Sequence, residues 1–414
     1  MKSLKNIVLA LALLFSTSLF AGELEVLHYW TSGGEAKAVG SLKDTLGKKG
    51  HTWKDFSVAG GAGDNAATVL KSRAVAGNPP TAAQVKGPAI QEWAELGLLR
   101  NIDHVAKANN WDAVLPEGFA NHMKYKGKYV AVPVNVHKVN WMWVNPAIFK
   151  KAGATIPTTW KEFEVAAKKI QKAGFIPVAH GGQPWQEITL FESIILAVGG
   201  PDFYQKTMVE ADVTALGSKT MVEAFGIFRM VKKYTDKNAP GRDWNLATAM
   251  VYKGEAAMQF MGDWAKGEFS VAKKAPGVDY VAYDIPGTNG SYLYNIDSFI
   301  LFDVKGKSAK SAQDDFAAAI LSDEFQTTFN ILKGSVPVKG GVSRVPFDDI
   351  ALRSMDQING TAYTNTLLPS LAHGMAVKPN IAGAITDVTT KFFNSKMSAK
   401  DGAKALAKAV KAEK

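Results

Sequence analysis

Residues 255–264, with the sequence EAAMQFMGDW, limit the possible folds more than any other part of the chain. Residues 256–258 form an apolar run that is long enough for a buried strand and too short for a helix. Gly262 ends the run, and Asp263 and Trp264 follow directly. Open α/β sheets bind ligands at the carboxyl ends of their strands. The stretch therefore predicts a carboxylate and a flat aromatic ring on a ligand-binding loop.

Asp263 and Trp264 together suit a ring that has an apolar face and hydroxyl groups on its edge. A Trp offers a flat apolar surface and one N–H donor, and a carboxylate accepts two or more hydrogen bonds. A pyranose sugar is such a ring. A core Trp264 beside an Asp263 that caps a helix is an equally good reading of these residues alone.

The same arrangement recurs near the start of the chain. Residues 24–30 read as a first strand that ends in Tyr29 and Trp30, and a turn then leads into a helix that carries Glu35. Two adjacent strand residues point to opposite faces, so at least one of the two aromatic rings faces the loop side. A second buried strand is predicted to end at Lys86, which either donates to ligand hydroxyls or lies on the surface.

Other polar and aromatic residues follow or interrupt later predicted strands. A buried strand at residues 175–180 precedes two of them, and a strand-like run at residues 292–302 contains two more. His373 lies in a loop, where an ordinary hydrogen-bonded histidine is the competing interpretation. These additional candidates for the site are Trp185, Gln186, Asn295, Asp297, Lys333 and His373.

Local signals outside these corners predict further elements. Thr159 and Glu162 form the capping box of a helix. Residues 93–99 show the Leu and Ala pattern of a short helix. Pro133 interrupts the strand at residues 130–136, and a proline within a strand indicates an edge or a crossing segment. We therefore expect the chain to cross there between two lobes.

The N-terminus has the pattern of a secretory signal peptide. Lys2 and Lys5 precede a wholly apolar run at residues 7–15, and cleavage is predicted after Ala21. The sequence contains no cysteine, which excludes disulfides and a lipid anchor on a cysteine. We therefore expect an exported, periplasmic protein whose core suffices without covalent links.

Composition excludes several classes of function. The formal charge of +10 is scattered over the predicted helices and is not gathered into a patch of the kind that binds nucleic acid. The seven histidines are dispersed, and no calcium-type carboxylate loop occurs, so we expect neither a metal nor a cofactor. With 414 residues, 47% of them hydrophobic, the chain is expected to be globular with two or three domains and monomeric.

The order of these motifs resembles the extracytoplasmic sugar-binding proteins of ATP-binding-cassette importers, the group that includes maltose-binding protein. Within that group the chain looks similar to the glucose- and mannose-binding branch over nearly all of its length after the signal peptide. The general resemblance rests on residues 125–127, 132–133, 157–160 and 254–264. The closer resemblance rests on residues 30–35, 60–65, 71, 84–87, 133–137, 181–186, 261–265, 295–298, 333–335 and 370–374.

The resemblance implies a two-lobe α/β periplasmic-binding-protein fold with a ligand cleft between lobes that crossing hinge segments join. The expected lobes are residues 22–133 with 287–340, and residues 134–286 with 341–414. It implies that a hexose is captured and delivered to an inner-membrane permease by hinge closure. The first lobe would supply Tyr29, Trp30, Glu35, Lys86, Asp297 and Lys333, and the second Trp264, His373, Trp185 and Gln186. The branch typically has a second Trp where this chain has Tyr29, which puts the choice of epimer in doubt.

Two other classes of function compete with transport. A secreted glycosidase would need a pair of acids at a defined separation, one with a raised pKa, and Glu35, Asp263 and Asp297 are the available carboxylates. Lysines in the same site would keep those acids ionised, which suits binding better than proton donation. A sugar sensor that docks on a receptor is compatible with the same residues. We expect no enzymatic activity.

Overall fold

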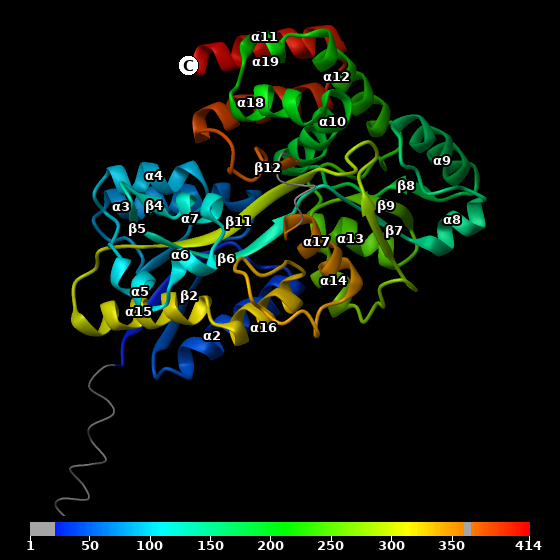
Figure 1. Ribbon diagram of the computed structural model, residues 1–414. Coiled ribbons are helices and arrows are strands. Elements are labelled where there is room, and N and C mark those ends of the chain that lie inside the picture. Colours follow the sequence, from blue (N-terminus) through cyan, green and yellow to red (C-terminus); the bar gives the residue numbers. More distant parts are fainter. Residues whose placement is uncertain (1–20, 360–365) are drawn as a thin grey trace, which may run out of the picture.

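The computed structural model describes residues 21–359 and 366–414, so residues 1–20 of the predicted signal peptide lie outside the described part. Two α/β halves lie side by side in it (Figure 1). The first half is built on a six-stranded sheet in the order β12-β11-β3-β1-β2, with β6 paired to β11. Its strands are β1 (Glu23–His28), β2 (Thr52–Ser57), β3 (Ala82–Gln84), β6 (Ala131–Lys138), β11 (Tyr292–Leu301) and β12 (Leu367–Pro369).

Strands β1, β2 and β3 run parallel, whereas β11 runs antiparallel to β3 and β6. The carboxyl ends of β1 and β3 therefore lie at one edge of the sheet. The helices of this half are α2 (Gly33–Gly47), α3 (Asp64–Val75), α4 (Pro88–Glu95), α5 (Asp103–Ala108), α6 (Trp111–Val114), α7 (Glu117–His122), α15 (Lys307–Ile320) and α16 (Asp323–Lys333). A short 3₁₀ turn at Gly61–Gly63 and the hairpin β4 (Lys124–Tyr125) and β5 (Lys128–Tyr129) complete it.

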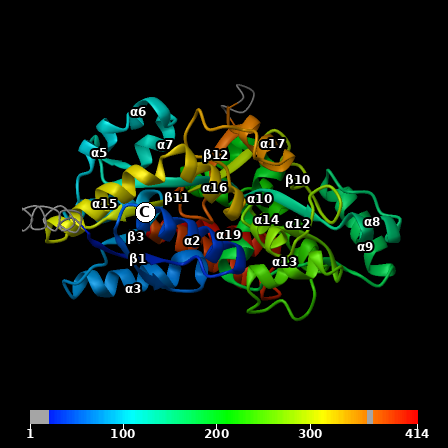
Figure 2. The same cartoon turned by 90° about the horizontal axis from the view of Figure 1, so that it is seen from below.

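The second half is built on a four-stranded sheet in the order β10-β7-β9-β8. Its strands are β7 (Trp141–Val144), β8 (Ile176–Val178), β9 (Ala256–Phe260) and β10 (Val281–Asp284). Figures 1 and 2 both place α8 and α9 at the end of this half that is farthest from α5 and α15. Its helices are α8 (Pro146–Ala152), α9 (Trp160–Lys172), α10 (Pro184–Tyr204), the π-helix η2 (Gln205–Val209), α11 (Val213–Leu216), α12 (Lys219–Lys232), α13 (Trp244–Tyr252), α14 (Ala265–Val271), α18 (Pro379–Phe393) and α19 (Ala399–Glu413). Helix α17 (Asp349–Asn359) contributes buried residues to the cores of both halves.

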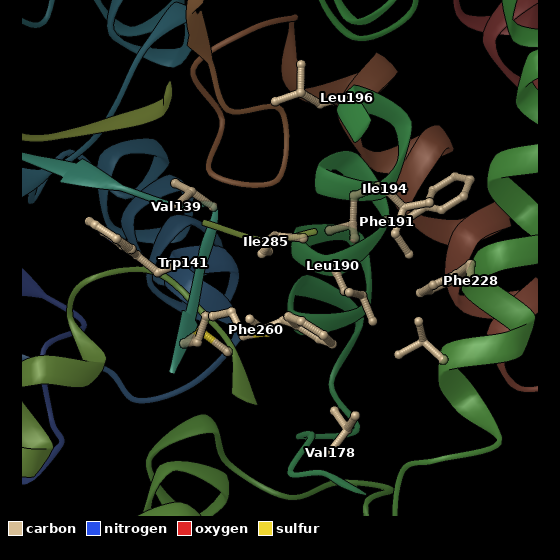
Figure 3. Close-up of a cluster of buried hydrophobic side chains, with 14 of the residues drawn as sticks. Val139, Trp141, Val178, Leu190, Phe191, Ile194, Leu196, Phe228, Phe260 and Ile285 are labelled. Atoms are coloured by element: carbon tan, nitrogen blue, oxygen red, sulfur yellow. The ribbon is translucent and has the colours of Figure 1, made fainter. Parts of the chain in front are cut away.

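Each half has its own hydrophobic core. In the second half the apolar α10 is buried on almost every side, because it packs between the sheet and the helices α12 and α18. Figure 3 shows Leu190, Phe191 and Ile194 of α10 between Ile285 on one side and Phe228 on the other. A helix that is apolar all round is expected in such a buried position.

Two segments carry the chain between the halves. Strand β6 leads directly into β7 of the second sheet, and β10 of that sheet leads back into β11. Pro133 lies on β6, which pairs in the sheet with β11 alone, and the register shifts beside it between Asp297 and Ser298. The edge strand is confirmed, but the crossing expected at Pro133 comes later, because this proline pairs with Ser298 within the first sheet and β6 continues to Lys138.

The local predictions differ in outcome. The capping box of Thr159 and Glu162 is present at the start of α9. The predicted helix at residues 93–99 is wrong in its bounds, because α4 spans Pro88–Glu95. Pro88 starts the helix since its fixed φ suits the first helical position, and Gly97 with φ of 70° follows the end. Lys333, a site candidate, is the last residue of α16.

Candidate functional site

A cavity of about 210 Å³ lies between the two halves. It collects side chains from the ends of β1, β3 and β9, from β11, and from loops that follow other elements. Every site residue predicted from the sequence lines it except Gln186 and Asp263. The predicted residues that do line it are Tyr29, Trp30, Glu35, Lys86, Trp185, Trp264, Asn295, Asp297, Lys333 and His373.

The first wall of the cavity is the corner between β1 and α2. Ser32 caps α2 and forms a capping box with Glu35, which fixes the turn after Trp30. Trp30 is 2% exposed and packs edge-on against Phe299 at 5.7 Å between ring centroids. The sequence predicted that at least one of these two rings faces the loop side, and both Tyr29 and Trp30 line the cavity.

Charged side chains of both signs face the cavity from the first half. Lys333 Nζ lies 2.9 Å from Glu35 Oε1 and 5.6 Å from the Trp30 ring centroid. Lys86 Nζ lies 5.4 Å from the centroid of the Tyr29 ring. Burial lowers the pKa of Lys86, and the nearby Asp297 opposes that shift.

Asp297 is the buried anion of the site. Burial alone would raise its pKa, but the hydrogen bond and charge of His137, together with Lys86 and Lys333, hold the pKa well below its usual range. Its Oδ1 has only long contacts of 3.4 Å with Gln84 Nε2 and with Asn295 Nδ2. Asp297 is therefore ionised, and Oδ1 keeps capacity to accept a hydrogen bond from a ligand.

Three rings from the second half form the opposite wall. Trp264, in the turn between β9 and α14, lies 4.8 Å from His373 and 6.4 Å from Trp185 between ring centroids. Burial, followed by the charge of Lys86, lowers the pKa of His373 well below its usual value. The imidazole is therefore neutral, with one nitrogen as donor and the other as acceptor.

Several buried polar atoms in the cavity wall have no hydrogen-bond partner in the described part of the chain. They are Tyr29 Oη, Asn295 Oδ1, and Nδ1 and Nε2 of His373. Burying such atoms unpaired costs roughly 1–3 kcal/mol each. A ligand that carries several hydroxyl groups would pair them.

Gln186 and Asp263 take other positions. Gln186 Nε2 donates to Gln183 Oε1 at 2.8 Å and to the Arg242 carbonyl at 3.0 Å, within the second half. Asp263 lies behind the cavity wall, where it accepts hydrogen bonds from His137 and from the backbone N–H of Lys138. Neither side chain meets the cavity.

The structure adds residues that the sequence reasoning left out of the site. His137 lines the cavity from the end of β6, and a further group lies around the N-termini of α2, α10 and α13. His137, within the block 133–137 of the resemblance, and the aromatic Trp244 could have been noticed from the sequence, whereas most of the others are ordinary loop and cap residues. These additions are Thr31, Ser32, Ala59, Gly60, Ala62, His137, Gln183, Asp243, Trp244 and Asn245.

Gly334 explains how α16 reaches the site. It ends the helix with φ of 89°, in the left-handed region that favours glycine. A Cβ at this position would lie 2.5 Å from the Asp263 carbonyl oxygen. The close approach sets Lys333 beside the corner that carries Trp264.

The described residues contain neither a metal-binding cluster nor a membrane-spanning helix. Among residues 21–359 and 366–414 no group of three or more His, Asp or Glu is arranged to hold a metal ion. Within the same ranges no helix combines the length and the apolar character that crossing a membrane requires.

The sequence matches the profile of the bacterial extracellular solute-binding protein family over residues 41–326, and the chain belongs to that family. A probable sugar-binding periplasmic protein of Brucella melitensis is 46% identical over 391 residues, which cover 94% of this chain and 92% of that protein. A protein of Rhizobium meliloti with the same description is 45% identical over 407 residues, or 98% of each chain.

Solved structures show the same fold at low sequence identity. A chitin oligosaccharide binding protein superposes with a TM-score of 0.81 at 19% identity, covering 95% of this chain and 98% of that one. Maltose-bound MalE3 of T. maritima gives a TM-score of 0.77 at 16% identity, covering 95% and 100%. The α/β chain therefore has the two-lobe periplasmic-binding-protein fold.

Proposed function

We propose that the protein captures one hexose in this cavity, outside the cytoplasm, and delivers it to the permease of an ABC importer. D-glucose is the proposed ligand, and mannose and galactose are the epimers to compare with it. One observation carries the proposal. The cavity has aromatic walls from both halves, and it also has buried polar atoms of Tyr29, Asn295 and His373 that find no hydrogen-bond partner in the described part of the chain.

The cavity chemistry fits a pyranose better than an anion or an apolar molecule. Trp30 and Trp264 line opposite halves of the cavity and can cover the C–H faces of a sugar ring. Asp297 accepts from hydroxyls, and Lys86 and Lys333 donate to them. Hydrogen bonds to charged groups contribute roughly 1.5–3 kcal/mol each. An epimer that leaves one of these groups unpaired loses affinity, which would give the site its selectivity.

The size of the cavity favours a monosaccharide. Drug-sized ligands occupy pockets of about 300–1,000 Å³, whereas this cavity measures about 210 Å³. A single hexose is the proposed occupant, and a disaccharide would have to extend toward the mouth at Asp243 and Trp244.

The carboxylates are arranged for binding and not for hydrolysis. A glycosidase needs an acid with a raised pKa beside a second carboxylate. The pKa of Asp297 is lowered, Asp263 is turned away from the cavity, and Glu35 is paired with Lys333. Release of free sugar from an aryl glycoside at a rate above that of the buffer would overturn this part of the proposal.

Transport requires that ligand binding changes the shape of the protein. We assign the six-stranded sheet with its helices to one lobe and the four-stranded sheet with its helices to the other. These lobes differ from the ranges expected from the sequence, 22–133 with 287–340 and 134–286 with 341–414, because β6 stays in the first sheet as far as Lys138 and β12 pairs with β11. A sugar held by both lobes would stabilise a closed form that the permease recognises. Close relatives are described as probable sugar-binding periplasmic proteins, which supports an exported protein with a cleaved signal peptide and a sugar as ligand.

A thermal-shift panel tests the proposal. The protein without its signal peptide would be unfolded, refolded to remove carried sugar, and heated with D-glucose, D-mannose, D-galactose or a polyol control. A ligand at 100 times its Kd stabilises the folded state by about 2.7 kcal/mol. We expect a clear rise in Tm with a hexose and none with the polyol. Equal curves with all additives would reject a hexose as the ligand.

A further inference from the structure

His137 joins the two walls of the cavity, although neither of its ring nitrogens is free to bind a ligand. It lies near the end of β6, beside the crossing to the second half, and is 1% exposed. Nδ1 contacts Asp263 Oδ1 in a short hydrogen bond, and Nε2 lies 3.0 Å from Asp297 Oδ2. One imidazole therefore connects a carboxylate that follows β9 with a carboxylate on β11.

The Nδ1 side of His137 fixes the corner that carries Trp264. Asp263 accepts from His137 through Oδ1 and from the Lys138 N–H at 2.9 Å through Oδ2, and its own N–H donates to the Lys138 carbonyl. The Trp264 ring meets the His137 ring edge-to-face, with 5.2 Å between centroids and 84° between planes. The position of Trp264 thus depends on His137 through a hydrogen bond and through direct contact.

The Nε2 side of His137 orients the anion that faces the ligand. Because Oδ2 of Asp297 is bonded to His137, Oδ1, with its two 3.4 Å contacts, is the oxygen left to accept from a ligand. The Asn135 side chain also lies 3.0 Å from Nε2, and its Oδ1 lacks a partner among the described residues. As placed, it is the amide nitrogen that faces Nε2, and a protonated Nε2 cannot accept from it, so the doubly protonated ring requires this amide to be turned with Oδ1 toward the imidazole.

The charges around His137 favour its imidazolium form. Asp263 and Asp297 bond the ring directly, and Lys86, Lys333 and the neutral His373 line the same cavity. Burial alone would lower the pKa of His137, but the two carboxylates reverse that effect and raise it. Neighbouring Lys138 is paired with a different acid, Asp284.

We infer that His137 is a positioning residue of the sugar site, which holds Asp297 and the Asp263–Trp264 corner in their binding geometry as a doubly hydrogen-bonded imidazolium. The inference rests on the proposed function, since it deepens the account of the same cavity. His137 makes no polar contact with the sugar and acts through its two neighbours. If the ring loses one proton, either Asp263 or Asp297 loses its hydrogen-bond donor. The side chain of that residue, and the wall it supports, are then no longer held in the binding geometry.

Two variants separate the roles of the two nitrogens. The amide nitrogen of His137→Asn can take the place of Nδ1, and that of His137→Gln the place of Nε2. We expect each variant to weaken glucose binding about tenfold, the size of one lost hydrogen bond to a charged group. His104→Gln is the matched control, because His104 is 56% exposed and contacts Asp314 at 3.0 Å away from the cavity. It should bind like the wild type.

A pH profile distinguishes positioning from a general loss of stability. Because the pKa of His137 is raised, the imidazolium persists through the ordinary histidine range near pH 6.5, and wild-type affinity should stay constant there and fall at higher pH. The fall should be absent from His137→Gln. A fall that persists unchanged in that variant would be due to Lys86, whose pKa is lowered, and would overturn the inference.

Nitrogen-resolved NMR of the unliganded wild-type protein tests the inference even if both variants fail to fold. The His137 imidazole, which bonds Asp263 and Asp297, should carry protons on both nitrogens at pH 7, in contrast to the neutral ring of His373. A neutral ring at that pH would overturn the inference, as would wild-type affinity in both folded variants. Failure of the wild type to bind any hexose would instead reject the proposed function, because the NMR result does not depend on sugar.

Discussion

Replacing Asp297 with Asn removes the buried anion of the cavity while keeping its shape. The side chain is 2% exposed, and Oδ2 is occupied by His137 Nε2 at 3.0 Å. Oδ1 has only the two 3.4 Å contacts and is the oxygen left for a sugar hydroxyl. Asp297→Asn should therefore cost the protein one charge-assisted hydrogen bond to its ligand.

The expected loss of glucose affinity follows from the removal of that single hydrogen bond. A hydrogen bond to a charged group contributes about 1.5–3 kcal/mol, and 1.4 kcal/mol corresponds to a factor of ten. Calorimetric titration of Asp297→Asn with D-glucose at pH 7 should show a Kd about 10- to 150-fold higher than that of the wild type. Asp303→Asn is the control, because Asp303 follows β11, is 59% exposed and pairs with Lys310 at the surface. If a folded Asp297→Asn protein binds glucose as tightly as the wild type, Asp297 is not a ligand contact.

Three further changes test other parts of the account. Trp264→Ala should weaken glucose binding at least about tenfold in a titration, since stacking on an aromatic ring contributes ~1–3 kcal/mol by analogy with nucleic-acid bases; unchanged affinity would remove Trp264 from the ligand contacts. Lys86→Met should weaken binding by a similar factor with little change in Tm, and a Tm loss without an affinity loss would make Lys86 structural. Burial raises the pKa of Glu192 to about 7, although Ser370, Tyr204 and two backbone N–H groups donate to it. As the pH rises from about 4.5 to 7, the free energy of unfolding of the wild type, measured in urea, should therefore fall relative to that of Glu192→Gln. The reason is that the carboxyl group loses its proton at a lower pH in the unfolded chain than in the folded protein. Parallel profiles would contradict that origin.

Local sequence signals correctly predicted those features of the fold that are determined by residues close together in the sequence. The capping box of Thr159 and Glu162 and the buried run that became β9 were both visible, because each needs only neighbours in sequence. The proline on β6 marked an edge strand for the same reason, since it cannot donate to a second partner. Helix bounds were less secure. The apolar pattern predicted a helix at residues 93–99, but Pro88 is the stronger start signal and α4 begins there.

The sequence predicted which strand ends approach one another but not which way each side chain points. Asp263 and Trp264 are adjacent, yet only Trp264 faces the cavity, because His137 and Lys138 bind the carboxylate from behind. Those partners are 126 and 125 residues away in sequence, so no local pattern could have revealed the contact. The residues around Trp244 were missed because packing within the second half brings Gln183 beside Asp243, which is 60 residues away in sequence.

The most direct test of the central claim is calorimetric titration of the refolded, sugar-free protein with D-glucose, D-galactose, D-mannose and maltose. The account predicts one-to-one binding with glucose tightest, weaker binding of the epimers, and weak or absent binding of maltose because the cavity measures about 210 Å³. The ratio between the epimers would show what Tyr29 contributes to the selectivity of the cavity. No heat of binding with any of the four sugars would contradict the assignment of this cavity to a hexose.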